Sequence, residues 1–137
     1  MTRLRCNQSL DPRQRFEWIG SKQFPPDRAR SRALGERCFE RGVQAAGPAR
    51  QMAAIIAAPD RTARLGQVTV PTTVIHGDAD PLVQPSGGKA TAAAIPRAHL
   101  ALIPGMGHHL PPVLWPRIAD LITATTREAD STRRDQR

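Results

Sequence analysis

The stretch TTVIHGDADPLV, residues 72–83, decides the fold class of this chain. Its first half is apolar and rich in β-branched residues, almost without alternation, which is typical of a strand covered on both faces. The apolar run breaks at Gly77, and two carboxylates follow at Asp78 and Asp80. We therefore predict a buried strand over 68–77 that ends in a tight turn presenting acidic side chains.

A second stretch, LALIPGMGHHLPP at residues 100–112, repeats this pattern with imidazoles. We predict a strand over 98–105 that leads into a loop carrying His108 and His109. The segment 85–96 between the two strands predicts a helix, with Ser86 as its N-cap. A helical crossover joins parallel neighbours, so both strands end at the same edge of the sheet, where open α/β folds bind ligands. The acids and the histidines are therefore expected to meet.

Helices are predicted on either side of this unit. One spans 25–42, with Ala33, Leu34 and Cys38 on its apolar face, and another spans 47–59. The second should pack through Met52, Ile55 and Ile56, and Asp60 can cap a short turn through Leu65. The last helix begins at about Val113, with an apolar face formed by Leu114, Ile118, Leu121 and Ile122. The fold class is α/β, a parallel strand-helix-strand-helix unit preceded by helices.

An acid beside a histidine supplies two of the three members of a Ser-His-Asp triad. The carboxylate accepts the imidazole Nδ1–H and stabilises the imidazolium that forms when Nε2 takes a proton. The residues alone leave the acid open between Asp78 and Asp80, and the base open between His108 and His109. His76 is interpreted as a structural histidine.

Two stretches of the sequence together resemble a known family. HGDADPLV followed by LIPGMGHHLP resembles the C-terminal half of the α/β-hydrolase superfamily, and particularly bacterial methyl esterase-type members. The resemblance implies that Asp80 of the HGxxD turn is the catalytic acid and that His108 of the GxGH turn is the general base. It leaves Asp78 as a solvated turn residue and the fallback acid, and His109 as a residue at the surface or rim. It also implies carboxylic ester hydrolysis by a Ser-His-Asp mechanism, acting on a small ester-like molecule without cofactor or metal.

One part of the family pattern is missing from the sequence. The family carries its nucleophile upstream on a G-x-S-x-G elbow. None of the serines lies between properly spaced glycines; they are Ser9, Ser21, Ser31, Ser86 and Ser131. We therefore expect a truncated hydrolase, inactive alone, with an N-terminal extension and cap-like segment over 1–60. The C-terminal part of the hydrolase core would span 61–126, and a charged, disordered tail 127–137.

Other classes of function are less well supported by the residues. The net charge is +8, but basic residues outside the ends are spread singly, which argues against nucleic-acid binding. Two cysteines, Cys6 and Cys38, indicate reduced thiols in a cytoplasmic protein. No apolar run approaches a membrane span of about 20 residues. Histidines and aspartates cluster at one sheet edge, but no metal-binding motif is present.

Two further hypotheses stay open beside the hydrolase. The chain can be a catalytically inactive fragment, or pseudoenzyme, that acts as a pairing module. An exposed sheet edge would then favour self-association or pairing with a missing N-terminal half. A basic nucleic-acid binder is the third hypothesis.

Overall fold

The computed structural model describes residues 19–42 and 46–135, and its centre is a two-stranded parallel sheet. Strand β1 (Thr73–Gly77) pairs with β2 (His99–Ile103), with Thr73 opposite His99 and Gly77 opposite Ile103. Both strands are shorter than predicted. β1 begins after Pro71, which has no backbone N–H to offer a sheet, and Val68 N–H instead donates to Leu65 O at the end of the preceding turn.

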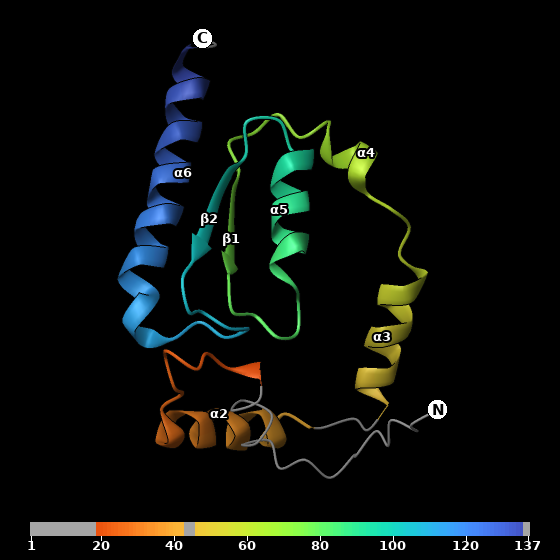
Figure 1. Ribbon diagram of the computed structural model, residues 1–137, viewed down its shortest axis with the longest axis vertical. Helices are drawn as coiled ribbons and strands as arrows, with labels where there is room; N and C mark the ends of the chain where they lie inside the picture. The colour runs from red at the N-terminus through yellow and green to blue at the C-terminus, as the bar shows by residue number, and fades with distance from the viewer. Residues whose placement is uncertain (1–18, 43–45, 136–137) are drawn as a thin grey trace.

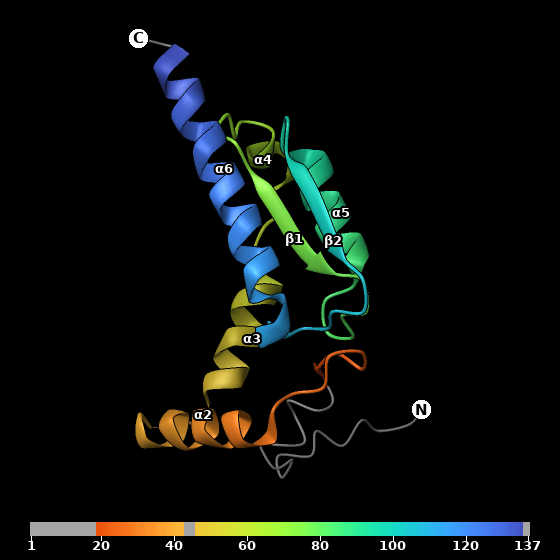
Figure 2. The ribbon, with the colours of Figure 1, turned by 90° about the vertical axis from the view of Figure 1, so that its left-hand side faces the viewer.

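Helices cover both faces of this sheet. Helix α5 (Pro85–Ala94) lies on one face and α6 (Trp115–Asp135) on the other, so the strands are enclosed between them (Figures 1 and 2). The hydroxyls of Thr73 and Thr125 are 2.6 Å apart and join β1 to α6. Buried Ile103, Met106 and Leu114 form the core, with Phe24, Ile75 and Ile118 packed against them. The predicted α/β fold is therefore confirmed, as a partial one.

Helix α5 begins differently from the prediction. Its N-cap is Gln84 and Pro85 is its first residue, so the prediction of Ser86 as the N-cap is wrong. Proline suits this first position because its φ is already helical and its missing N–H would have no partner there. The helix therefore starts before the serine.

Three helices precede the sheet: α2 (Arg28–Glu40), α3 (Gly47–Ala57) and the short α4 (Thr62–Leu65). Asp60 Oδ1 accepts hydrogen bonds from the backbone and hydroxyl of Thr62, as its predicted capping role requires. No residue of α2 or α3 is buried, however. The prediction that Met52, Ile55 and Ile56 of α3 pack in a core is wrong, because α3 lies beside the strand unit instead of on the sheet (Figure 1).

A short 3₁₀ helix, η1 (Pro112–Leu114), leads into α6, which continues to Asp135. The sequence predicts a disordered tail from residue 127, and the structure differs here. The helix continues to Asp135 because neither glycine nor proline interrupts the chain between Arg117 and that residue. Glu128 of α6 also forms an ion pair with Arg97 of the turn before β2, at 3.6 Å. None of the described helices is both long enough and apolar enough to cross a membrane.

Candidate active site

The turns that follow β1 and β2 are joined by their backbones. Asp78 N–H donates to Ile103 O, and Ala79 N–H donates to Met106 O, at 3.2 and 3.1 Å. This approach requires glycine at position 77, since a Cβ there would lie 2.1 Å from Met106 O. The glycine that ends β1 therefore lets the acidic turn pack directly on the histidine turn.

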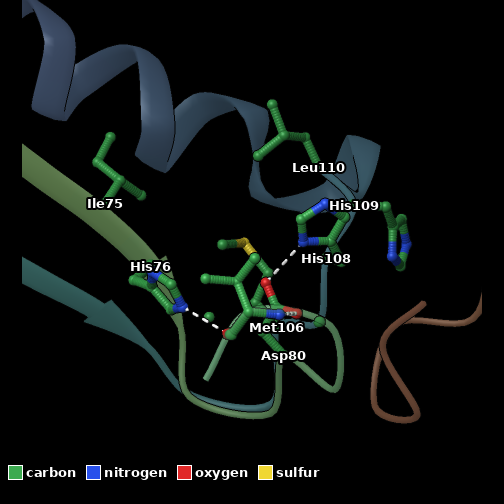
Figure 3. Close-up of a pocket in the computed structure, with 10 residues that line it drawn as sticks. Ile75, His76, Asp80, Met106, His108, His109 and Leu110 are labelled. Atoms are coloured by element: carbon green, nitrogen blue, oxygen red, sulfur yellow. Dashed lines mark hydrogen bonds and ion pairs between the residues drawn. The ribbon is translucent and has the colours of Figure 1, made fainter. Parts of the chain in front are cut away.

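Asp80 and His108 meet in this assembly, as the sequence predicts. His108 Nδ1 lies 2.8 Å from Asp80 Oδ2 (Figure 3). The Asp80 side chain is 7% exposed and the His108 side chain 37% exposed. The carboxylate is thus enclosed while part of the imidazole reaches solvent. Their catalytic roles stay predictions, but the contact on which those roles depend is present.

The second oxygen of the Asp80 carboxylate is also occupied. Oδ1 accepts the backbone N–H groups of Leu82 and Val83 at 2.8 and 2.9 Å. Burial by itself raises the pKa of Asp80, but the hydrogen bonds from Val83, His108 and Leu82 outweigh burial and lower the pKa below its ordinary value. Asp80 is therefore an anion at neutral pH and can only accept hydrogen bonds.

The tautomer of a neutral His108 follows from this charge. Nδ1 must donate to the carboxylate, which leaves the lone pair on Nε2, at the other edge of the ring. The ring borders a cavity of about 240 Å³. That cavity is lined by Ile75, His76, Gly77, Asp80, Val83, Met106, Gly107, His108, His109 and Leu110. The arrangement can accept a proton from a hydroxyl group placed in a largely apolar pocket.

Asp78 has a different position from Asp80. Its side chain is exposed, as expected, but Oδ1 accepts the N–H of Gly105 at 2.7 Å. Gly105 has a φ of +71°, in the left-handed region that glycine tolerates best. Asp78 therefore holds the start of the histidine turn in an unusual conformation, which is more than the solvated turn residue predicted from the sequence.

The other two histidines near the site have separate contacts. His76 Nε2 lies 3.0 Å from Val83 O, and its ring packs against Gly88 of α5, in agreement with a structural role. His109 is half-buried, and its Nδ1 accepts the backbone N–H of Ser21 at 3.1 Å. His109 also lines the cavity, which agrees with the predicted position at its rim, and a segment from before α2 covers part of the ring.

A metal centre requires three or more ligands around one point. In the ranges 19–42 and 46–135, no such group of His, Cys, Asp and Glu is found. The metal-ligand residue types that cluster at one sheet edge in the sequence therefore form no such centre within these ranges.

Ser21 is the residue at this site that sequence reasoning did not single out. It is 3% exposed, and its Oγ accepts the N–H of Gly107 at 2.7 Å across 86 positions of sequence. The residues around Ser21 carry no periodicity and no motif, so no signal in the sequence points to this contact.

Comparison with known families agrees with this geometry. A family model described as "Serine aminopeptidase, S33" matches residues 42–111, just over half of the chain. The matched range contains β1, α5, β2 and both turns, with Asp80 and His108. The chain therefore belongs to this family of hydrolases, within the α/β-hydrolase superfamily.

Proposed function

We propose that this chain supplies the acid and the base of a serine hydrolase that cleaves carboxylic esters of small molecules. The observation that carries the proposal is the 2.8 Å hydrogen bond between His108 Nδ1 and Asp80 Oδ2, beside an open, partly apolar cavity. Because the sequence has no G-x-S-x-G elbow, the serine nucleophile would be supplied by a polypeptide segment other than residues 1–137.

In the proposed reaction, His108 Nε2 takes the proton of the serine hydroxyl while the serine oxygen adds to the ester carbonyl. The imidazolium is stabilised by Asp80, which already accepts its Nδ1–H. His108 then gives the proton to the leaving alcohol, and the acyl-enzyme forms. A water molecule, deprotonated by the same nitrogen, attacks the acyl group and releases the acid.

The lining of the cavity supports a small acyl or alkyl group as the bound portion. Ile75, Val83, Met106 and Leu110 contribute apolar side chains, and the imidazole of His108 lies among them. An apolar lining with few convergent polar groups is typical of small-molecule sites. No cofactor takes part in this mechanism.

The test has two stages with short-chain nitrophenyl esters. The purified chain alone should show no turnover, because it lacks the nucleophile. The chain produced together with the coding segment that precedes Met1 should hydrolyse the ester if that segment carries the elbow. In that assembly, His108→Ala and Asp80→Asn should each lower kcat by about 10⁴-fold.

His99→Ala is the matched control, since His99 is exposed at the start of β2. It should leave the rate unchanged. Turnover by the chain alone that disappears in His108→Ala would overturn the proposed division of the triad. Equal activity of the His108→Ala and native assemblies would overturn the role of His108.

A second candidate is a catalytically inactive pairing module, either a homo-oligomer or the partner of a separately encoded half. The observation that favours it is the exposure of Met52, Ile55 and Ile56 on α3, each over half exposed. Apolar residues gathered on one helix face often mark an interface. Sedimentation equilibrium tests this candidate, and a monomer at every concentration would overturn the homo-oligomer.

We propose a cytoplasmic location for either candidate. Cys38 is a free, exposed thiol, and a reducing compartment keeps such thiols from oxidising. Fractionation of cells that express the chain with a C-terminal tag would test the location, and recovery in a secreted or periplasmic fraction would overturn it.

A further inference from the structure

The segment Ile19–Phe24 lies against the turn that carries His108. It approaches the loop end of the sheet from the side of α2, and in the close-up it passes beside His109 (Figures 1 and 3). Its residues belong to no described strand or long helix, and they fall outside the range matched by the family model. The contacts between this segment and the histidine turn therefore need an explanation of their own.

Three consecutive residues of the turn are hydrogen-bonded to the segment. Gly107 N–H donates to Ser21 Oγ at 2.7 Å, and His108 N–H donates to Ile19 O at 2.9 Å. Ser21 N–H in turn donates to His109 Nδ1 at 3.1 Å. Each bond fixes one residue of the turn, and the residue in the middle is His108.

Close packing adds to these hydrogen bonds. A Cβ at Gly107 would lie 2.5 Å from Gly20 O, and a Cβ at Gly105 would meet the side chain of Gln23. Two of the glycines in the turn thus have no room for a side chain because the segment lies against them. Phe24 continues the contact by packing against the buried core of Ile103, Met106 and Leu114.

Ser21 is not placed to act as a nucleophile itself. Its hydroxyl oxygen is buried and already accepts the Gly107 N–H, and it lies 3.5 Å from His109 Nδ1, which the N–H of Ser21 also engages. Among the described residues no carboxylate is hydrogen-bonded to His109, and no hydrogen bond joins Ser21 to His108. The serine is therefore placed to support the turn.

We propose that Ile19–Phe24 is a clamp that holds the imidazole of His108 against Asp80, with Ser21 as its positioning residue. Without the clamp, the turn Gly105–His109 would keep the hydrogen bonds of Gly105 to Asp78 and of Met106 to Ala79, but would lose those at Gly107, at the backbone of His108 and at His109. The ring of His108 would then sample orientations that do not meet the carboxylate. This inference rests on the proposed function, in which His108 is the base.

The test is NMR spectroscopy of the ¹⁵N-labelled full chain, which needs no catalysis. The hydrogen-bonded Nδ1–H of His108 gives a downfield proton signal, assigned by its loss in His108→Gln. In Ser21→Ala this signal should broaden or disappear. The backbone amide of Gly107 should exchange with solvent about tenfold faster, as expected from the loss of one hydrogen bond. Ser86→Ala is the matched control, an exposed serine on α5 that should change neither quantity.

Two variants of His109 test the clamp if Ser21→Ala does not fold. In His109→Asn, the amide oxygen can take the place of Nδ1 and accept the Ser21 N–H, whereas His109→Leu offers no acceptor. The His108 signal should persist in the first and weaken in the second. An unchanged signal and unchanged exchange in Ser21→Ala, or in His109→Leu, would overturn the clamp. Absence of ester hydrolysis in the assembled enzyme, with the NMR result as expected, would instead overturn the proposed function alone.

Discussion

The carboxylate of Asp80 shows how a buried charge can be stabilised by its own turn. It accepts three donors, from Leu82, Val83 and His108, and only 7% of its side chain is exposed. Two of these donors are backbone N–H groups within three residues of Asp80, so the conformation of the turn itself stabilises the ionised carboxylate. A buried acid with this many donors contributes to stability as well as to chemistry.

We expect Asp80→Asn to lower the free energy of unfolding at neutral pH by about 1–3 kcal/mol, since donors that a carboxylate satisfied lose part of their acceptor. The pKa of Asp80 is lowered in the folded chain, so its contribution is present above the ordinary pKa of about 3.9 and is lost as the pH falls through the lowered value. The difference between the variant and the native chain should therefore shrink as the pH falls below about 3.9. Urea unfolding at several pH values measures it.

Asp120→Asn serves as the control for this experiment, because Asp120 is exposed on α6. It should change the free energy of unfolding little at any pH. A destabilisation by Asp80→Asn that stays constant down to acid pH would contradict the role given to the charge.

Replacement of glycine by alanine should have opposite effects on stability at Gly77 and at Gly35. A Cβ at Gly77 would meet Met106 O at 2.1 Å, whereas a Cβ at Gly35, within α2, meets nothing within 4 Å. Gly77→Ala should destabilise the chain by about 1–3 kcal/mol, as overpacking does. Gly35→Ala should be neutral or stabilise by up to about 1 kcal/mol, as alanine does in helices. Thermal melts of both variants test this, and equal shifts of the same sign would contradict it.

The two strands and the helix between them could be predicted from the sequence, because each follows from a local pattern and a single crossover joins the strands. The β-branched run before Gly77, the helix closed by Pro96 and the apolar run before Gly105 predict a βαβ unit. The right-handed crossover then brings Asp80 and His108 to one edge, although 28 positions separate them. Topology alone predicts that the acidic turn meets the histidine turn, and the family resemblance selects Asp80 and His108 within them.

The clamp could not be predicted in this way. Ser21 and Gly107 are 86 positions apart, and no crossover rule relates a loop before α2 to a turn after β2. The hydrogen bond between Ser21 and His109 belongs to the same contact, so it was missed as well. Exposure of Met52, Ile55 and Ile56 on α3 was missed for a related reason: periodicity predicts a helix, but it does not say what is available for the helix to pack on.

The contact between the clamp and the histidine turn should weaken at acid pH. Burial lowers the pKa of His109, and the nearby backbone of Phe24 opposes this only in part. Since the folded chain favours neutral His109, its contribution to stability is present above the ordinary pKa of about 6.5 and is lost as the pH falls through the lowered value. A protonated Nδ1 is a donor and cannot accept the Ser21 N–H. Hydrogen exchange at Gly107 and His108, corrected for the intrinsic rate, should therefore accelerate as the pH falls below about 6.5.

His109→Asn separates this titration from every other one in the chain. The asparagine side chain keeps an acceptor for Ser21 but does not ionise in this range. Exchange at Gly107 should then lose its dependence on pH between neutral and mildly acid conditions. The same acceleration in His109→Asn as in the native chain would show that another group controls the contact.

In the molecule as a whole, the buried hydrophobic core is small and lies at the end of the sheet where the two turns meet. The fully enclosed core consists of a few residues beneath the turns, whereas Leu34, Phe39, Met52, Ile55 and Ile56 on α2 and α3 are exposed. Arg30 lies 4.6 Å from the ring centre of Trp115, and this cation–π contact fastens the start of α2 to the start of α6. Helices α2 and α3 therefore present large apolar side chains that a partner could cover.

The exposed apolar face of α3 favours self-association of the chain. A charged side chain on this face should weaken that association. Ile56 is 78% exposed beside Ile55 and Met52, and these three residues form an exposed apolar face on α3. If it pairs with a second copy, Ile56→Asp places an unpaired charge in the interface and should raise the dissociation constant by at least about tenfold, because a buried charge without a partner costs more than 1.4 kcal/mol. Sedimentation velocity over a range of concentrations measures the change. Ile122→Asp on α6, where the isoleucine is 55% exposed, is the matched control for added charge. Equal dissociation by both variants would place the interface elsewhere, and no dissociation by Ile56→Asp would exclude α3 from it.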